Sequence, residues 1–128
     1  LIVPVLHGAD ALGVRDLAVR AAASIEAARA DELRLEDVQG GTFTLNNTGA
    51  LGSIVSAPII NHPQAAIVTT EAIVKRPVVV EGDAIVVRSM MNLCMTFDHR
   101  VCDGAEAGRF LADLKLRFEA IDETSTLL

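Results

Sequence analysis

The sequence predicts an α/β fold in which short aliphatic strands pack with two amphipathic helices. Apolar residues make up 51% of the 128 residues but aromatic residues only 3%, so the residues that can form a core are mostly aliphatic. Two segments carry apolar residues at helical spacing, and the β-prone runs between them are short. The length fits one compact domain and is too small for two ordinary ones.

The first third of the chain predicts a strand, a helix and a charged surface segment. Residues 1–6 (LIVPVL) form a continuous apolar run, which is consistent with a buried strand. Asp10 is a candidate helix N-cap. The helix is predicted from apolar residues at helical spacing, namely Val14, Leu17, Ala18, Ala21, Ile25 and Ala28. The charged residues 31–37 are expected at the surface.

The remainder predicts strands followed by a final helix. Residues 42–45 form a β-prone run, and the Asn-, Gly- and Ser-rich residues 46–56 predict a loop. Residues 65–74 favour a strand, and residues 77–80 and 84–88 favour a hairpin around Glu81-Gly82-Asp83. Apolar and polar residues alternate in a further predicted strand, 92–98. The last helix begins at about Gly104, with Ala107, Phe110, Leu111, Leu114, Phe118 and Ile121 on one face.

Composition excludes several classes of function. The net charge is −6, from 17 acidic and 11 basic residues, and the chain has no Trp or Tyr. It therefore lacks the basic surface and stacking rings of a nucleic-acid-binding protein and the positive charge that binds anionic membranes. Its apolar runs are too short to span a bilayer. Cys94 and Cys102 fit neither a disulfide scaffold nor metal-ligand spacing, so we expect no metal and a reduced cytoplasmic compartment.

The densest group of chemically versatile side chains is the segment DHRVCDG, residues 98–104, between the alternating strand and the last helix. Histidine suits proton transfer near neutral pH, and loops at strand ends often carry catalytic groups. A structural role is equally open for each residue. Asp103, with Glu106 three residues on, fits a capping box, Asp98 and Arg100 fit an ion pair, and a single histidine such as His99 is more often structural.

This segment resembles the Asp-His-Arg-x-x-Asp-Gly signature of the dihydrolipoyl acyltransferases of 2-oxoacid dehydrogenase complexes. Residues 1–10 (LIVPVLHGAD), 40–49 (GGTFTLNNTG) and 57–64 (APIINHPQ) are similar to other segments of that family, in the same order. The resemblance implies a chloramphenicol-acetyltransferase-like two-layer sandwich of mixed sheet and helices. It covers the C-terminal half of the catalytic domain, so residues 1–128 are expected to lack the N-terminal half and the lipoyl and peripheral-subunit-binding domains.

The resemblance also implies a reaction, the movement of an acyl group between a dihydrolipoyl thioester and coenzyme A. His99 matches the catalytic histidine, and its implied role is the general base that removes the thiol proton. Asp103 matches the second residue of the motif, where some members have Asn. Its implied role is to hold the loop and His99, which agrees with a capping box, and Arg100 is expected to support the same loop.

The turn after residues 42–45 contains a second group of candidate site residues. Many relatives place a Ser or Thr hydroxyl here to stabilise the oxyanion of thioester exchange, whereas this chain has Asn46, followed by Asn47, as a branched-chain-like subset of the family does. An amide can also donate a hydrogen bond. Asn46 is therefore the expected oxyanion donor, and Asn46 and Asn47 are expected to contact coenzyme A, unless both only shape the turn.

Partners are implied in the same way. The family site lies between subunits of a homotrimer, with the histidine from one and the turn from its neighbour, and trimers build a larger core. The resemblance also implies decarboxylase and dihydrolipoyl dehydrogenase partners and a lipoyl group carried on another domain. The location is then the cytoplasm, or the mitochondrial matrix in a eukaryote. The aliphatic excess is explained by surface that meets other parts of this assembly.

Four points stay open in the sequence. The chain could instead be a non-catalytic oligomerisation scaffold or a free-standing acetyltransferase of the chloramphenicol type. Lys75, Arg76 and Arg88 are its few basic candidates for coenzyme A, or else solvated charges at strand ends. The turn Asn46-Asn47-Thr48 and the segment Val74-Lys75-Arg76-Pro77 most resemble members with branched-chain or general acyl specificity. The apolar end, residues 126–128, either contributes to a subunit contact or is a frayed tail.

Overall fold

The computed structural model describes residues 2–122 and residue 125. The chain divides into two compact units, one formed by residues 1–41 with 117–128 and the other by residues 42–116. Each is described by itself. The expected contact at residues 126–128 lies outside the described residues.

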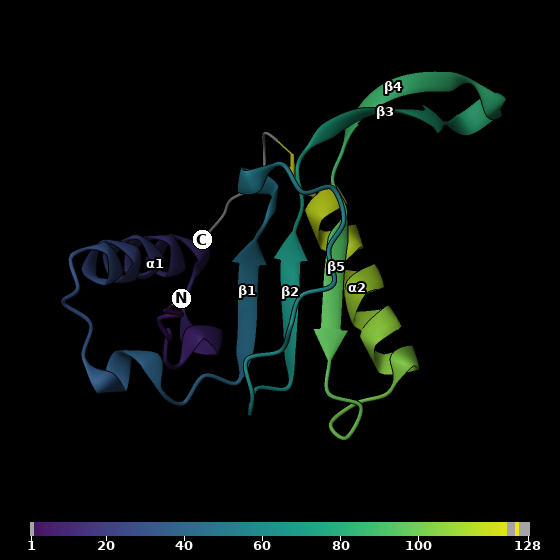
Figure 1. The fold of residues 1–128 in the computed structure, drawn as a ribbon. Helices are drawn as coiled ribbons and strands as arrows, with labels where there is room; N and C mark the ends of the chain where they lie inside the picture. The colour runs from purple at the N-terminus through teal and green to yellow at the C-terminus, as the bar shows by residue number, and fades with distance from the viewer. Residues whose placement is uncertain (1, 123–124, 126–128) are drawn as a thin grey trace. The chain divides into compact units, whose positions relative to one another are not determined.

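The first unit is built on helix α1, Val14–Arg29, preceded by the short 3-10 helix η1, Ala9–Ala11 (Figure 1). The expected N-cap at Asp10 is wrong. Leu12 has extended backbone angles and separates the two helices, so α1 is capped by Gly13 and Asp10 lies within η1. The chain then makes a second 3-10 helix, η2, Leu35–Val38.

The strand expected at residues 1–6 is also wrong for the part that is described. Residues 2–6 have no regular secondary structure, and Ile2 is exposed. The backbone N–H of Val5 donates to the carbonyl of Asp37 at 2.8 Å. Pro4 interrupts the run without an N–H of its own, so the segment cannot form a continuous ladder of hydrogen bonds there.

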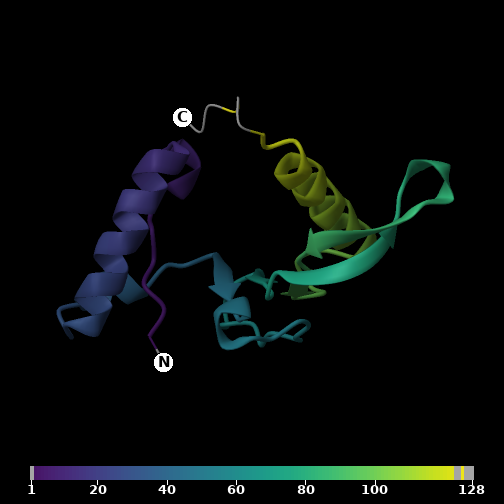
Figure 2. The same cartoon turned by 90° about the horizontal axis from the view of Figure 1, so that it is seen from above.

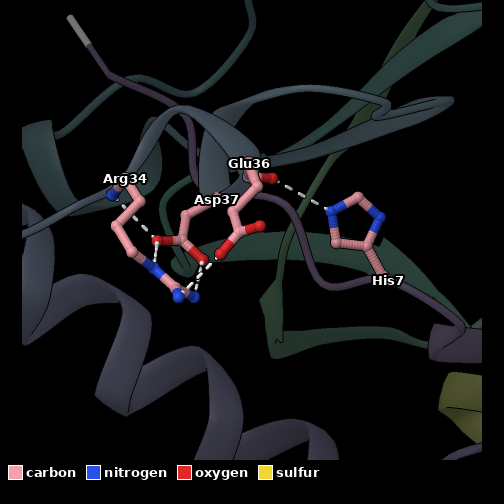
Figure 3. A network of polar contacts seen from close by, with 4 residues as sticks. All are labelled: His7, Arg34, Glu36 and Asp37. Atoms are coloured by element: carbon pink, nitrogen blue, oxygen red, sulfur yellow. Dashed lines mark hydrogen bonds and ion pairs between the residues drawn. The ribbon is translucent and has the colours of Figure 1, made fainter.

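Polar contacts anchor η2, and Figure 3 shows the four residues that make them. The Asp37 carboxylate accepts hydrogen bonds from the backbone N–H and the guanidinium of Arg34, which lowers the pKa of Asp37. Arg34 also pairs with Glu36 at 2.7 Å. His7 Nε2 lies 3.2 Å from the Glu36 carbonyl oxygen, which links η2 to the preceding segment. Exposed pairs of this kind contribute little stability.

A three-stranded mixed sheet forms the core of the second unit. Strands β1, Phe43–Asn47, and β2, Ala66–Thr70, run parallel, and β5, Leu93–Phe97, pairs antiparallel with β2. Figure 1 shows β2 between the other two. Four of its five residues are buried, because it has a partner strand on each side. The strand expected over residues 65–74 is shorter than predicted, since it ends at Thr70 and a new strand begins at Val74.

The predicted hairpin is confirmed. Strands β3, Val74–Val79, and β4, Ile85–Met90, pair antiparallel around the 3-10 turn η4, Glu81–Asp83. Gly82 in this turn has a φ of 77°, which a residue without a side chain adopts most easily. The hairpin extends beyond the end of the three-stranded sheet (Figure 1).

Helix α2, Gly104–Glu119, begins where the sequence predicts. In Figure 2 its first turns lie over one face of the sheet, which gives this unit two layers. The Phe110 ring meets the ring of Phe43 from β1 with centroids 5.9 Å apart, and Ala107 is buried. The α/β class is thus confirmed. Across the described residues, no helix combines the length and apolar character that crossing a bilayer demands.

Candidate active site

Residues 98–104 form a hydrogen-bonded turn between the end of β5 and the start of α2. The Asp98 N–H donates to the carbonyl of Ala65 at 2.8 Å, which ties the start of the turn to β2. The N–H of Val101 donates back to the Asp98 carbonyl at 2.9 Å. His99 is the first residue of the turn and is exposed, with its ring 5.7 Å from the Phe97 ring. The fold therefore presents His99 to solvent on an anchored turn.

The predicted pair between Asp98 and Arg100 is confirmed. Asp98 accepts hydrogen bonds from the backbone N–H and the side chain of Arg100, the shortest being 2.6 Å from Nη2. The Arg100 side-chain hydrogen bonds are the main reason that the pKa of Asp98 falls to about 2, and the nearby charge of His62 lowers it further. The Asp98 carboxylate bridges from the residue before His99 to Arg100, the residue after it, and so fixes the backbone from which His99 projects.

Because the pKa of Asp98 is lowered in the folded state, we expect the free energy of unfolding to fall as the solution becomes acidic. A carboxyl with a pKa of about 2 folded and 3.8 unfolded stabilises the fold fully above about pH 5 and loses this contribution as pH falls from about 4 to about 2. The free energy of unfolding is measured by denaturant titration at pH 6 and at pH 3. Asp98→Asn is expected to lower it at pH 6, and the difference between its values at the two pH values is expected to be smaller than in the unaltered protein. An unchanged difference would contradict this role of Asp98.

The capping box at the start of α2 is confirmed. Asp103 Oδ1 accepts from the Glu106 N–H at 2.9 Å, and the Asp103 N–H donates to Glu106 Oε2 at 2.9 Å. Asp103 therefore fixes the far end of the turn that carries His99, and this contact accounts for a supporting role without any proton transfer. Burial, followed by the charges of Glu106, Asp103 and Asp98, raises the pKa of the Cys102 thiol, so that thiol is a poor nucleophile.

Asn46 and Asn47 end strand β1, and both are exposed. Asn47 Oδ1 accepts a hydrogen bond from the Ala50 N–H at 3.2 Å, so Asn47 does shape the turn. The Asn46 carbonyl accepts from the Thr70 hydroxyl at 3.4 Å, which leaves the Asn46 amide out of that contact. The roles of the two amides toward an oxyanion and coenzyme A stay predictions.

The fold does not bring His99 and Asn46 together. Asn46 pairs across β2 with Thr69, and Thr69 with Cys94, whereas Phe97 lies three residues past Cys94. Two strand spacings of about 4.8 Å separate β1 from β5 across the sheet, and three residues at about 3.3 Å each separate Cys94 from Phe97 along β5. Each of these offsets is about 10 Å, which is far beyond the length of a hydrogen bond. Figure 1 shows why: β1 and β5 run in opposite directions, so their carboxyl ends lie at opposite ends of the sheet.

Two of the three basic side chains of the hairpin, Lys75 and Arg76, have partners in the folded structure, whereas Arg88 on β4 does not enter these contacts. Lys75 Nζ donates to Ser89 Oγ at 2.8 Å, and Arg76 Nη1 donates to Asn92 Oδ1 at 3.0 Å. These contacts support a structural reading of both charges. In the described parts of the chain, no group of three or more His, Cys, Asp or Glu side chains has the arrangement of a metal site.

Sequence reasoning missed one buried ionisable group, Glu71. It follows β2 and its exposed fraction is only 2%. It accepts hydrogen bonds from the hydroxyls of Thr48 and Ser56, on the loop that follows Asn46 and Asn47. The sequence did carry one signal for this group. A carboxylate inside the apolar run 65–74 would be buried in an uninterrupted strand, and such burial requires hydrogen-bond partners.

Comparison with known proteins gives one consistent family. Residues 1–126 match the model of the 2-oxoacid dehydrogenases acyltransferase (catalytic domain). The chain is 48% identical over 127 residues to the lipoamide acyltransferase component of the branched-chain alpha-keto acid dehydrogenase complex of Bacillus subtilis, covering 99% of this chain and 30% of that protein.

Two solved structures are also similar. A probable dihydrolipoamide acetyltransferase from Listeria monocytogenes has a TM-score of 0.90 and 46% identity over 98% of this chain and 53% of its own. The dihydrolipoamide acetyltransferase of Azotobacter vinelandii, studied for the role of a serine, a histidine and an asparagine in its catalytic mechanism, has a TM-score of 0.81 and 36% identity over 88% and 46%. The chain thus spans about a third of the Bacillus relative and about half of each solved chain.

Proposed function

The chain belongs to the 2-oxoacid dehydrogenase acyltransferase family, within its catalytic domain, and from this we propose that it transfers an acyl group between a dihydrolipoyl thioester and coenzyme A. The observation that carries the proposal is His99, exposed on a turn that is fixed at both ends. The histidine and asparagine studied in the Azotobacter enzyme are four positions apart, which is the spacing of His99 and Asp103 here.

In this proposal His99 is the general base. It accepts the proton of the attacking thiol, so that the sulfur attacks the thioester carbonyl as a thiolate, the reactive form. When the carbon–sulfur bond to the leaving thiol breaks, His99 returns the proton to that sulfur. Proton and acyl group are thus balanced without a further reactant. Asp103 and Arg100 hold the turn, and neither exchanges a proton.

Asn46 supplies the oxyanion stabilisation. The carbonyl oxygen becomes negative during the attack, and the Asn46 amide donates a hydrogen bond to it, as backbone and side-chain donors do in acyl-transfer enzymes. Asn46 and Asn47 also offer exposed amides to the polar parts of coenzyme A. The acyl group arrives on a lipoyl group attached to another domain.

The site combines two copies of the chain. His99 and Asn46 lie at opposite ends of one sheet, so a single copy cannot place both at one carbonyl. A homotrimer in which His99 of one copy faces Asn46 of the next supplies both groups at each interface. Large exposed apolar side chains, including Leu45, Leu51 and Ile59, fit a surface that is covered in an assembly.

Further partners follow from the same membership. A core of such trimers would receive acyl groups made by a 2-oxoacid decarboxylase and would pass the reduced lipoyl group to a dihydrolipoyl dehydrogenase. One of the solved relatives is the cubic core of a pyruvate dehydrogenase multienzyme complex, which supports a large assembly for this chain.

The activity and its acyl group are tested together. The full-length protein is assayed for transfer to coenzyme A from acetyl, succinyl and isobutyryl dihydrolipoamide. We propose branched-chain specificity, because the Asn46-Asn47 turn and the similarity to the Bacillus branched-chain component favour it, and therefore expect the highest kcat/KM with isobutyryl. Higher values with acetyl or succinyl would overturn the specificity, and no transfer with any of the three would overturn the activity.

A further inference from the structure

Glu71 is a buried carboxylate bound to two positions of one loop. Its Oε2 accepts from the Thr48 hydroxyl at 2.9 Å, and its Oε1 accepts from the Ser56 hydroxyl at 2.5 Å. Thr48 begins the connection from β1 to β2 and Ser56 lies further along it, while Glu71 itself follows β2 of the core sheet. One side chain thus fastens residues 48–56 to the rigid part of the unit.

The hydroxyl protons fix the direction of this network. Thr48 has one hydroxyl proton, and it donates that proton to Glu71. The Thr69 hydroxyl is then the donor in its 3.0 Å contact with the Thr48 hydroxyl, which is shorter than its alternative contact with the Thr70 carbonyl at 3.5 Å. Thr69 has an exposed fraction of 0%, so this chain of donors starts inside the core and ends on the Glu71 carboxylate.

The network needs Glu71 in its ionised form. The hydrogen bond from Ser56 is the main cause that lowers the pKa of Glu71, and bonds from Ser53, Thr48 and Cys94 act in the same direction against the effect of burial. The Thr48 and Ser56 hydroxyls are neutral donors, and each donates to a different oxygen of the carboxylate. An ionised carboxylate, which only accepts, is the side chain that satisfies them together.

Backbone contacts make the same junction tight. The Thr48 N–H donates to the Thr70 carbonyl at 3.1 Å, and the Ala72 N–H donates to the Ser53 carbonyl at 2.7 Å. A Cβ added to Gly49 would lie 2.3 Å from the carbonyl carbon of Glu71, so the loop backbone lies directly on the residues around the carboxylate. Movement of Glu71 would therefore move the loop.

We propose that Glu71 is a positioning residue for acyl transfer, which holds the loop at Thr48 so that the adjacent Asn46 amide stays aimed at the oxyanion. The proposal rests on the proposed function of Asn46. Thr48 is two residues from Asn46, and Asn47 is tied to the same loop through Ala50. An oxyanion donor is effective only when its position is fixed before the reaction, and a misplacement of about 1 Å can lower the rate about 10²-fold.

The test uses Glu71→Gln in the full-length, assembled protein. The amide keeps the shape of the side chain, but it replaces one acceptor by a donor that faces a hydroxyl. We expect kcat to fall about 10-fold or more, with KM for coenzyme A changed by less than about threefold, because the loss concerns an interaction made in the transition state. Glu32→Gln, which changes an exposed carboxylate of the other unit, is expected to match the unaltered protein.

A double variant separates positioning from a general effect on the fold. If Glu71 acts through Asn46, then Glu71→Gln in an Asn46→Ala background causes no further loss of kcat. Losses that multiply, or an unchanged kcat in Glu71→Gln alone, would overturn the proposal. A loss in Glu71→Gln with full activity in Asn46→Ala would overturn it as well, because Glu71 would then act through another group.

The two proposals fail separately. Full activity of Asn46→Ala removes the oxyanion role of Asn46, whereas a defect in that variant and none in Glu71→Gln removes only the role of Glu71. If Glu71→Gln does not assemble, Ser56→Ala is the substitute, since it removes only the hydroxyl bound to Oε1. It is expected to lower kcat several-fold, again without further loss in the Asn46→Ala background, and an unaltered kcat would overturn the proposal.

Discussion

Replacing His99 with alanine is expected to lower the rate of acyl transfer to coenzyme A by about 10²–10⁴-fold, the usual contribution of a general base. The imidazole is exposed, and the turn beneath it is held by Asp98, Arg100 and the capping box of Asp103. The truncation therefore removes the base and leaves its support. Initial rates with excess acyl dihydrolipoamide measure the effect, and light scattering measures assembly.

The matched control is His7→Ala. His7 is an exposed histidine in the other unit, and its ring nitrogen Nε2 contacts the backbone carbonyl of Glu36. We expect this variant to keep full activity. Undiminished activity in His99→Ala would disprove the assignment of His99 as the base. His99→Asn, which keeps a polar side chain, gives the same test should the alanine variant not assemble.

Two inactive variants are expected to regain activity when they are mixed. His99→Ala and Asn46→Ala each abolish every site in a uniform trimer, the second because loss of an oxyanion donor costs about 10²–10³-fold. In co-assembled trimers, a site is intact when one copy supplies His99 and its neighbour supplies Asn46. With random mixing in equal amounts, about a quarter of the sites are intact, so about a quarter of the activity returns.

The measurement requires that subunits exchange, so the two variants are refolded together or co-expressed and then assayed as purified assemblies. Mixing intact assemblies without exchange is the control and is expected to restore nothing. A co-assembled sample that stays inactive would show that both groups come from one copy, which would also contradict the separation of β1 and β5 ends in the sheet.

Local signals in the sequence predicted much of the fold. The turn Glu81-Gly82-Asp83 marks a hairpin because its backbone preferences lie within a few residues, and Asp103 with Glu106 marks the start of α2 for the same reason. Apart from the N-cap expected at Asp10, which is a local error, the errors concern pairing over long range. Residues 1–6 have strand composition, but strand formation depends on a partner, and the core strand β2 ends at Thr70 because the chain leaves the sheet there.

The site could be predicted in part. His99 and Asp103 belong to one short motif, so the sequence predicts that they share one turn, but their roles in catalysis follow only from the family resemblance. The distance between His99 and Asn46 depends on the directions of β1 and β5 relative to β2, which composition and periodicity do not contain. The role of Glu71 could not be predicted from the sequence, for another reason. Its burial depends on hydroxyl groups about 15 to 23 positions earlier in the chain, and their meeting is a result of the fold.

The hairpin of β3 and β4 also bears on the order in which the sheet forms. It is the most local pairing in this unit, so it can close within microseconds. Because Val74 then lies opposite Met90, the closed hairpin brings Thr70 near Leu93, its own partner in β2 and β5. With the hairpin closed, only the short connections 71–73 and 91–92 have to be ordered when β2 and β5 pair, so the pairing costs less conformational entropy. Folding is thus expected to proceed from hairpin to central pair, with the parallel strand β1 added last.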